Sequence, residues 1–455
     1  MRKIALLAAL LLAIGVEGAT LKKHTRKKHP ASRTTASAGT ITPPKRRSVI
    51  RRAVAHIVPV SAAVRARAVE KASNQVQPLA DAFDNPAALV PFFERLYRLE
   101  HGGDSVHVLH FGDSHTASDD LPAALRAEFQ SRFGNGGPGF AFAGHPFKGY
   151  RRFDVSGSNS NDWYTEGIVT RPDDGKEGLG GISLQTTAPG QTISFTAEAD
   201  QLELYCLRQP DGGGMQFYVD GSPVETIDTS GQFGSDFFSY VPAAGVHQYE
   251  LVTATSAPVR VFGWVAQNHQ GITWETLGIN GASADILLNW DENLFDSQIA
   301  RRDPALVVLA YGTNEAVRPR FDAMAYRESF RQVLQRIRHA SPATSILVVG
   351  PPDCMRNARG QLATFGHLDE IIDIQRAVAR EEGCAFWDWR RRMGGPGSKR
   401  TWVQAGFAQS DYVHFTSSGY QLIGKGLSSD LLLQYSSFLN VRSEIANEQQ
   451  ARKDQ

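Results

Sequence analysis

Apolar positions follow two different periods, and the changes between them divide the chain into segments. The run Val106, Val108, Leu109 and Phe111 is typical of a parallel strand buried on both faces. Residues 120–133 repeat apolar side chains at helical spacing. Strands that alternate with helices in this way predict a parallel sheet with helices on both faces. Further strands are predicted at 306–311, 345–350 and 384–389, and further helices at 87–99, 325–338, 368–382 and 418–438.

The pattern of apolar and polar residues changes between these α/β segments. From about residue 140 to 270, short segments such as 192–196 and 216–219 alternate apolar and polar residues and are separated by turn signals such as Pro189-Gly190. Helical periodicity is absent there, so we predict a β-sandwich, 141–270, inserted into one discontinuous α/β domain. That domain comprises 76–140 and 271–440, and 441–455 is predicted to be a flexible tail.

The amino terminus has its own composition. Residues 1–19 combine Arg2 and Lys3 with an apolar run, as in a secretory signal peptide, although the run also allows an uncleaved anchor. Residues 21–71 then carry 14 Lys or Arg and one acid, which predicts a basic disordered linker over 20–75. From Ala72 onward, 32 basic face 45 acidic residues. We therefore expect export to the periplasm, cell envelope or medium, with the linker attracted to an anionic envelope and no nucleic-acid partner.

The strand at 106–111 ends in a sharp turn that carries a candidate nucleophile. Gly112 permits the turn, and Asp113 and Ser114 are good helix-start residues. A serine there has its hydroxyl in the open beside backbone N–H groups, as acyl transfer requires. Gly-Asp-Ser is also a common tripeptide, and a single copy is usually just a turn or a helix cap.

Three further segments fall where a parallel sheet places its site, at the carboxyl ends of strands. They are residues 277–282, 311–315 and 411–416. His414 is the candidate base for a serine hydroxyl, and Asp411, three residues earlier, can orient the imidazole. The predicted catalytic residues are Ser114, Asp411 and His414, and the predicted oxyanion-hole donors are Ser114, Gly281 and Asn314.

These four segments resemble the blocks of the SGNH, or GDSL-like, hydrolase family, whose motif residues fall on Ser114, Gly281, Asn314 and the Asp411/His414 pair. The resemblance implies a flavodoxin-like parallel sheet. Within that family, Gly-Asp-Ser followed by His115, the β-rich insertion and the run 278–282 are similar to bacterial peptidoglycan O-acetylesterases. Those relatives imply a carbohydrate-binding-module-like insertion and an acetyl ester on N-acetylmuramic acid as substrate. His115 replaces the usual leucine, which argues against a lipase.

Several alternatives stay open at this point. The same site would also suit a xylan or other polysaccharide acetylesterase, a glycan O-acetyltransferase, or a glycan-binding envelope protein without catalysis. His115 and Glu315 are candidates for substrate contact, although a structural role is the main alternative for both. No cofactor or metal is expected, the chain is expected to be a monomer, and the three cysteines, Cys206, Cys354 and Cys384, are assigned as structural.

Overall fold

The computed structural model describes residues 60–169, 174–358 and 361–453. All of them belong to one compact unit, Pro59–Gln455. The predicted signal peptide and most of the predicted basic linker lie outside the described residues, so those predictions stay untested. Within the described ranges, no helix has both the length and the apolar character that crossing a bilayer requires.

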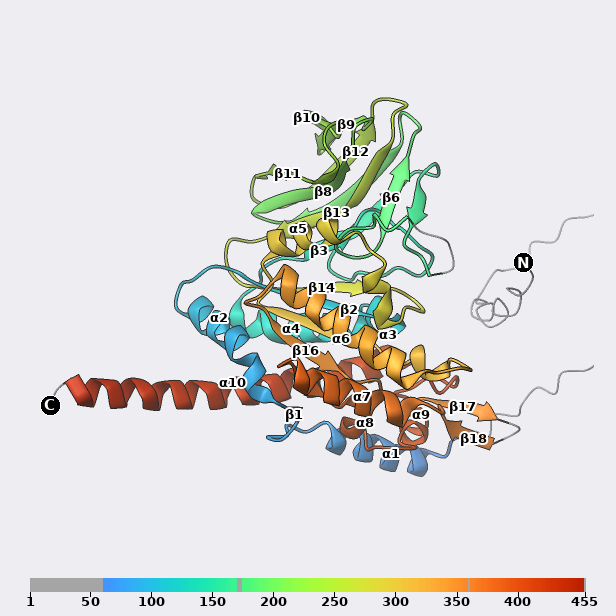
Figure 1. Ribbon diagram of the computed structural model, residues 1–455, viewed down its shortest axis with the longest axis vertical. Coiled ribbons are helices and arrows are strands. Elements are labelled where there is room, and N and C mark those ends of the chain that lie inside the picture. The colour runs from blue at the N-terminus through green and yellow to red at the C-terminus, as the bar shows by residue number, and fades with distance from the viewer. Residues whose placement is uncertain (1–59, 170–173, 359–360, 454–455) are drawn as a thin grey trace, which may run out of the picture. The chain divides into compact units, whose positions relative to one another are not determined.

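A six-stranded sheet forms the centre of the α/β domain (Figure 1). The five strands from β19 to β14 run parallel, and the two-residue β1 pairs antiparallel with β19 at the edge. The predicted parallel sheet with covering helices is therefore confirmed. In spatial order the strands are β1 (Phe83–Asp84), β19 (Ala385–Trp387), β16 (Ser345–Val349), β15 (Leu306–Ala310), β2 (Val106–Gly112) and β14 (Ile272–Gly278).

Each central strand contributes side chains to two hydrophobic cores, because alternate side chains point to opposite faces of the sheet. In β2, Leu109 and Phe111 enter one core, while Val106 and Val108 enter the other. The first core is covered by α5 (Glu292–Arg302), α6 (Ala323–Ala340) and α7 (Leu368–Glu381), together with the 3-10 turn η2 (Ala284–Leu288). The second is covered by α2 (Val90–Glu100), which follows η1 (Pro86–Leu89), and by α4 (Asp120–Phe133) and α10 (Ser417–Lys453).

The insertion consists of two antiparallel sheets that enclose a third core. Its first strand, β3 (Gly139–Phe142), pairs with β13 (Val259–Gln267), so the chain enters and leaves the insertion side by side. One sheet has the order β10 (Ser222–Asp228), β9 (Gly214–Val219), β12 (Val246–Thr253), β7 (Thr192–Glu198) and β4 (Ser156–Asn159). The other has the order β11 (Gly234–Tyr240), β8 (Gln201–Arg208), β13, β6 (Ser183–Thr186) and β5 (Tyr164–Glu166).

The second of these sheets is buried on both faces. In β8, Leu202 and Leu204 face the sandwich core, while Tyr205 and Leu207 join the core that lies under α5 and α6. Strand β8 thus packs the insertion against the α/β domain, because its side chains enter the cores of both. Of the insertion aromatics that could stack on a sugar, Trp163, Phe237, Phe238 and Tyr240 pack against the cores, and Tyr164 is exposed.

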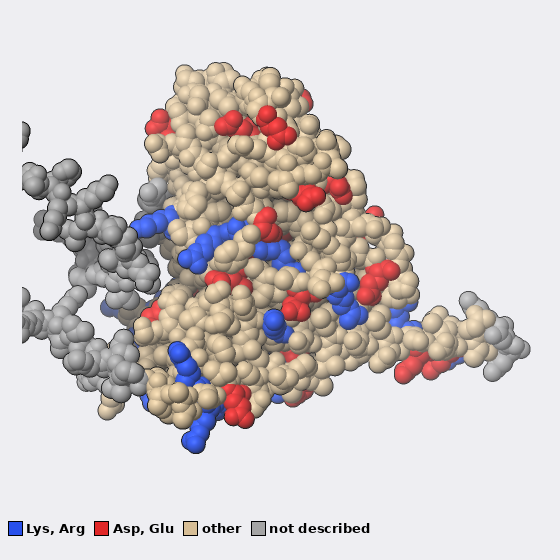
Figure 2. Space-filling model, turned by 180° about the vertical axis from the view of Figure 1, so that it is seen from behind, with Lys and Arg blue, Asp and Glu red and all other residues tan. Residues whose placement is uncertain are grey.

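The surface carries charges of both signs. On the face shown in Figure 2, basic and acidic side chains are interspersed in the middle and lower parts of the molecule, while only acidic ones are visible at its top. All three cysteines are buried free thiols, as expected for structural residues.

Two predictions about the ends of the folded part need correction. Residues 62–75, predicted as the end of a disordered linker, form helix α1 (Ala62–Gln75), whose buried Ala68 and Ala72 face the body. The predicted flexible tail is helical instead, because α10 continues to Lys453. A hairpin of β17 (Met355–Ala358) and β18 (Gln361–Thr364) was also not predicted. The remaining elements are α3 (Ser114–Ala117), η3 (Glu315–Val317), α8 (Trp389–Arg392) and α9 (Lys399–Ala405).

The exposure of α10 beyond Ser443 leads to a first prediction. Deleting residues 444–455 should change the free energy of unfolding by less than about 0.5 kcal/mol, because the described side chains removed are exposed. Leu427→Ala, in the same helix but with a buried side chain, should cost about 2–5 kcal/mol. Urea unfolding of both variants checks this. A deletion as costly as Leu427→Ala would show that the projecting helix stabilises the fold.

Candidate active site

Ser114 is placed by a turn that only a small residue allows. Strand β2 ends at Gly112, where a Cβ would lie 2.1 Å from Oγ1 of Thr116. The next residue, Asp113, caps helix α3 by accepting the His115 N–H at 2.9 Å. Ser114 is therefore the first helical residue after a parallel strand, with the N-terminal N–H groups of α3 around it.

Three predicted catalytic side chains lie in one hydrogen-bonded line. Oγ of Ser114 is 3.0 Å from Nε2 of His414. Nδ1 of His414 is 2.7 Å from Oδ2 of Asp411, whose Oδ1 accepts the N–H groups of Val413 and His414. Burial raises the pKa of the Asp411 carboxyl, but these hydrogen bonds outweigh it and bring the pKa below its ordinary value. The carboxylate thus stays ionised opposite Nδ1 of His414, where it accepts the N–H of the imidazole and stabilises an imidazolium.

The loop that carries Asp411 and His414 is fixed by its own backbone. Tyr412 takes a left-handed conformation at φ 61°, and its N–H donates to the carbonyl of Gln409. Gln409 N–H donates in turn to the carbonyl of His414 at 2.9 Å. Met355 N–H joins strand β17 to the same loop through the carbonyl of Tyr412. The histidine is therefore held by a closed turn and not by a free loop.

The predicted oxyanion donors converge on the same edge. Gly281 has φ +79°, and nothing lies within 4 Å of the place where its Cβ would stand. In the described part of the chain, neither the Ser114 N–H nor the Gly281 N–H donates a hydrogen bond. Nδ2 of Asn314 donates to the carbonyl of Ala282 at 2.8 Å, while its second hydrogen makes only a long 3.5 Å contact with Asp113. All three donors thus have hydrogen-bonding capacity to offer to an anion.

Two consecutive residues after β15 hold the turn that follows β14. Besides the bond from Asn314, Oε1 of Glu315 accepts the N–H of Ala284 at 2.9 Å. The two bonds hold the carbonyl of Ala282, the neighbour of Gly281, and the N–H of Ala284, two residues further along the turn. The position of the Gly281 N–H is therefore set by side chains from the next strand.

The carboxyls on this side of the site are buried acids. Burial raises the pKa of Asp113 to about 6, although the His115 N–H opposes it. Burial likewise raises the pKa of Glu315 to about 7, against the hydrogen bond from Ala284. Both groups therefore take up a proton at a pH far closer to neutral than ordinary carboxyl groups do.

The structure does not support the predicted substrate contacts of His115 and Glu315. Each residue is only 1% exposed. Nδ1 of His115 lies 2.8 Å from the Tyr420 hydroxyl, and its ring packs edge-on against the aromatic rings of Trp389 and Phe415. Adjacent residues in a short helix point in different directions, so the residue after the nucleophile enters the core. Glu315 begins the turn η3, as the helix-start alternative has it.

Metal-ligand candidates occur on the surface of α5 and α6. Potential ligand atoms of Glu292, Asp296 and His339 lie within 4.8 Å of one another. Glu292 and His339 are exposed and Asp296 is half-buried, so the group is equally consistent with a surface ion pair, and we assign no metal to it.

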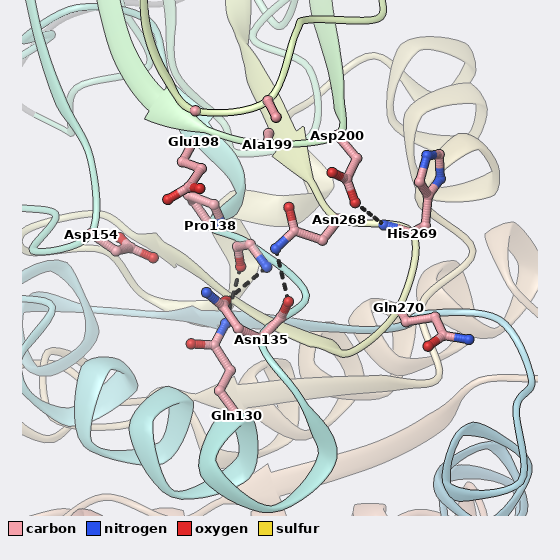
Figure 3. A pocket seen from close by; sticks show the side chains of 13 residues that line it. Gln130, Asn135, Pro138, Asp154, Glu198, Ala199, Asp200, Asn268, His269 and Gln270 are labelled. Atoms are coloured by element: carbon pink, nitrogen blue, oxygen red, sulfur yellow. Dashed lines mark hydrogen bonds between the residues drawn. The ribbon is translucent and has the colours of Figure 1, made fainter.

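A large cavity lies away from the reacting edge. A cavity of about 770 Å³ at the junction of the insertion and the α/β domain is lined by Gln130, Asn135 and Asn268, with Glu198 and Asp200 (Figure 3). Asn135 bridges to the first residue of β14, whereas Ser114 follows the last residue of β2, at the opposite end of the sheet. Neither Ser114 nor His414 lines this cavity.

Comparisons with known proteins agree with this arrangement. Residues 244–422 match the GDSL-like Lipase/Acylhydrolase family, a range that contains Gly281, Asn314, Asp411 and His414 but not Ser114. A solved structure described as "Peptidoglycan O-acetylesterase in action, 5 min" is 27% identical, with a TM-score of 0.65, and covers 76% of this chain and 96% of that chain.

Other solved structures are more distant. A family two carbohydrate esterase from Clostridium thermocellum with cellohexaose is 12% identical, covering 55% of this chain and 94% of that chain, with a TM-score of 0.27. One from Cellvibrio japonicus is 11% identical, covering 62% and 98%, with a TM-score of 0.28. Scores this low carry no argument. No curated protein matches the chain.

Fold and comparisons together define the class of protein: the chain is a carboxylic ester hydrolase built on a parallel α/β sheet. The family match over residues 244–422 and the similarity to a peptidoglycan O-acetylesterase support the SGNH, or GDSL-like, hydrolase family that its sequence blocks predict.

The buried carboxyl of Glu315 allows a test of this side of the site. Its raised pKa means that the native state binds a proton more tightly than the unfolded state, so its stabilising contribution falls as pH rises from about 4.5 through 7. Glu315→Gln stays neutral and keeps an acceptor for Ala284. We expect the variant to exceed the parent in unfolding free energy by roughly 2–4 kcal/mol at pH 8.

The difference should vanish near pH 4.5, and urea unfolding at both pH values measures it. Glu448→Gln, at an exposed position of α10, serves as the control. A Glu315→Gln effect that does not change with pH would contradict the assignment of Glu315 as a buried, proton-binding acid.

Proposed function

We propose that this chain is an exported serine esterase that removes O-acetyl groups from a cell-envelope glycan. The favoured substrate is peptidoglycan, acetylated on N-acetylmuramic acid. The observation that carries the proposal is the line from Ser114 through His414 to Asp411, which lies at the sheet edge beside the oxyanion donors. The 27% identity to a peptidoglycan O-acetylesterase supports the choice of glycan.

The first half of the reaction uses all the assigned groups. Oγ of Ser114 attacks the acetyl carbonyl carbon while Nε2 of His414 takes its proton. Asp411 accepts a hydrogen bond from Nδ1–H and stabilises the imidazolium that forms. The N–H groups of Ser114 and Gly281 and the amide of Asn314 bind the tetrahedral oxyanion. The imidazolium then protonates the departing sugar oxygen, which leaves acetyl-Ser114.

The second half reverses the roles with water. Nε2 of His414 accepts a proton from a water molecule, whose oxygen attacks the acetyl carbonyl of acetyl-Ser114. The same three donors bind the second oxyanion. When this intermediate collapses, His414 returns the proton to Oγ and acetate leaves. Water is the only co-reactant in this scheme.

The open site suits a small acyl group on a large polymer. An acetyl group needs little enclosed volume, and Ser114 and His414 are both partly exposed. A lipid acyl chain would need a deep apolar pocket instead. This feature favours a glycan ester over a lipid ester.

Export and envelope attachment are further parts of the proposal. The charged and apolar pattern of residues 1–19 supports secretion, and the basic stretch at 21–71 supports attraction to an anionic envelope. The chain is proposed to act as a monomer.

Removing the nucleophile tests the reaction directly. Ser114→Ala should lower acetate release from O-acetylated peptidoglycan at least about 10⁴-fold, because no other hydroxyl is placed within reach of His414 Nε2 among the described residues. Acetate is measured enzymatically with residues 60–455. Ser118→Ala, at the end of the same short helix, is the matched control and should keep activity within a few-fold.

The alternatives give different results in this assay. Activity on an aryl acetate but not on peptidoglycan would retain the Ser114 chemistry and point to xylan or another acetylated polysaccharide. Acetate that appears only as a new sugar ester when an acceptor glycan is added would identify a transferase. Glycan binding that Ser114→Ala leaves unchanged, in a parent without esterase activity, would identify a binding protein.

The amide of Asn314 is the oxyanion donor that can be removed. Asn314→Ala should lower kcat about 10²–10³-fold with a smaller change in KM, because the lost bond forms mainly in the transition state. Asn293→Ala, on the exposed surface of α5, should leave both constants unchanged. An Asn314→Ala enzyme with parental kcat would remove this residue from the oxyanion hole.

A further inference from the structure

A lysine side chain is completely buried beneath the loop that carries His414. Lys399, the first residue of α9, is 0% exposed. Its Nζ has no hydrogen-bond partner among the described residues and lies 3.3 Å from the centroid of the Phe415 ring. A buried ammonium without an acceptor is costly, because it loses its hydration and gains only the attraction of the aromatic face. Packing alone would be better served by an apolar side chain.

A buried carboxylate next to the Lys399 backbone is already paired with another cation. Asp353, fully buried after β16, accepts the backbone N–H of Lys399 at 3.0 Å and lies 3.3 Å from the guanidinium of Arg390. The Lys399 ammonium is thus not the partner that neutralises Asp353. Its field acts instead on the groups around it, and its interaction with Asp411 places it in the electrostatic environment of the His414 imidazole.

The ammonium carries its charge in the neutral range. Burial lowers the pKa of Lys399 to about 8, against the attraction of Cys354, Asp411 and Asp353. At pH 7 the side chain is therefore mostly protonated. His115, which interacts with both His414 and Lys399, is neutral there, because burial holds its pKa well below the ordinary value.

We propose that Lys399 is a positioning residue for the esterase reaction, whose buried positive charge opposes protonation of His414 and so extends activity to lower pH. The inference rests on the proposed function. A base that is already protonated cannot accept the proton of Ser114, so any group that disfavours the imidazolium in the free enzyme moves the loss of activity to a lower pH.

The charges around His414 act in both directions. Asp411 from the same loop and Asp113 before α3 favour the imidazolium, as two nearby anions should. Lys399 from α9 is a buried cation, and its charge disfavours the imidazolium. The titratable or charged groups that face His414 or its loop are Asp411, Asp113, His115, Cys354, Asp353, Lys399 and Tyr420.

The pH profile of kcat/KM tests the charge. With an aryl acetate as substrate, Lys399→Met should raise the midpoint of the acid limb by roughly 0.5–1 pH unit, while the plateau rate stays within a few-fold of the parent. Methionine keeps the length and apolar stem of lysine and removes only the charge. Lys425→Met, which removes a lysine charge from the surface of α10, should leave the midpoint in place.

Two further measurements separate this role from simple packing. Phe415→Leu removes the ring beneath the ammonium but no charge, so its acid limb should coincide with that of the parent. Lys399→Met should also raise the midpoint of thermal unfolding at pH 7. Because the pKa of Lys399 is lowered on folding, that gain should be complete below pH 8 and shrink as pH rises toward 10.5.

The outcomes are distinct. An active, folded Lys399→Met with an unchanged acid limb would overturn the inference, and a lower thermal midpoint together with an unchanged limb would leave Lys399 as a packing residue. If Lys399→Met does not fold, Lys399→Gln, also neutral and close in length, gives the same comparison. Full activity in Ser114→Ala would instead overturn the proposed esterase function itself.

Discussion

The site depends on one register in the central sheet. Gly112 at the end of β2 lies opposite Gly278 of β14 on one side and Ala310 of β15 on the other. All three are small, and α3 packs so closely over them that a Cβ on Gly278 would lie 2.2 Å from the Ala117 nitrogen. The residues that follow these three positions are the ones that meet around Ser114. A shift of one residue in either pairing would turn alternate side chains to the wrong face and separate the site.

The same register explains why a large insertion does not disturb the site. The chain leaves the α/β domain at β3 and returns through β13, and these two strands are antiparallel neighbours. The break in the sequence is therefore closed in space before β14 begins. Because β8 and β13 also contribute side chains to the core under α5 and α6, the insertion adds burial to the domain that it interrupts.

Sequence patterns predicted the parts of the fold that local chemistry decides. A glycine followed by Asp113 as a helix cap indicates the turn at Ser114, and short polar segments after apolar runs indicate the other site loops. Helix α1 could not be predicted in this way, since it has few large apolar residues. It forms against α9 and through Arg392, which donates to the carbonyl of Gln75. The burial of Lys399 could not be predicted either. A charged residue at a helix start gives no local sign that loops distant in the sequence will cover it.

The carboxyl groups of the site differ in pKa according to whether they lie beside His414 or beside the oxyanion donors. On the side of His414, hydrogen bonds keep Asp411 ionised where an imidazolium forms. On the side of the oxyanion, the acids Asp113 and Glu315 are deprived of water, and their pKa values rise to about 6 and about 7. An ionised carboxylate there would oppose a developing oxyanion. Burial protonates Glu315 in part at neutral pH and so reduces the opposing charge, whereas Asp113 stays mostly ionised. Burial and hydrogen bonding thus produce opposite shifts in chemically identical groups on the two sides of one serine.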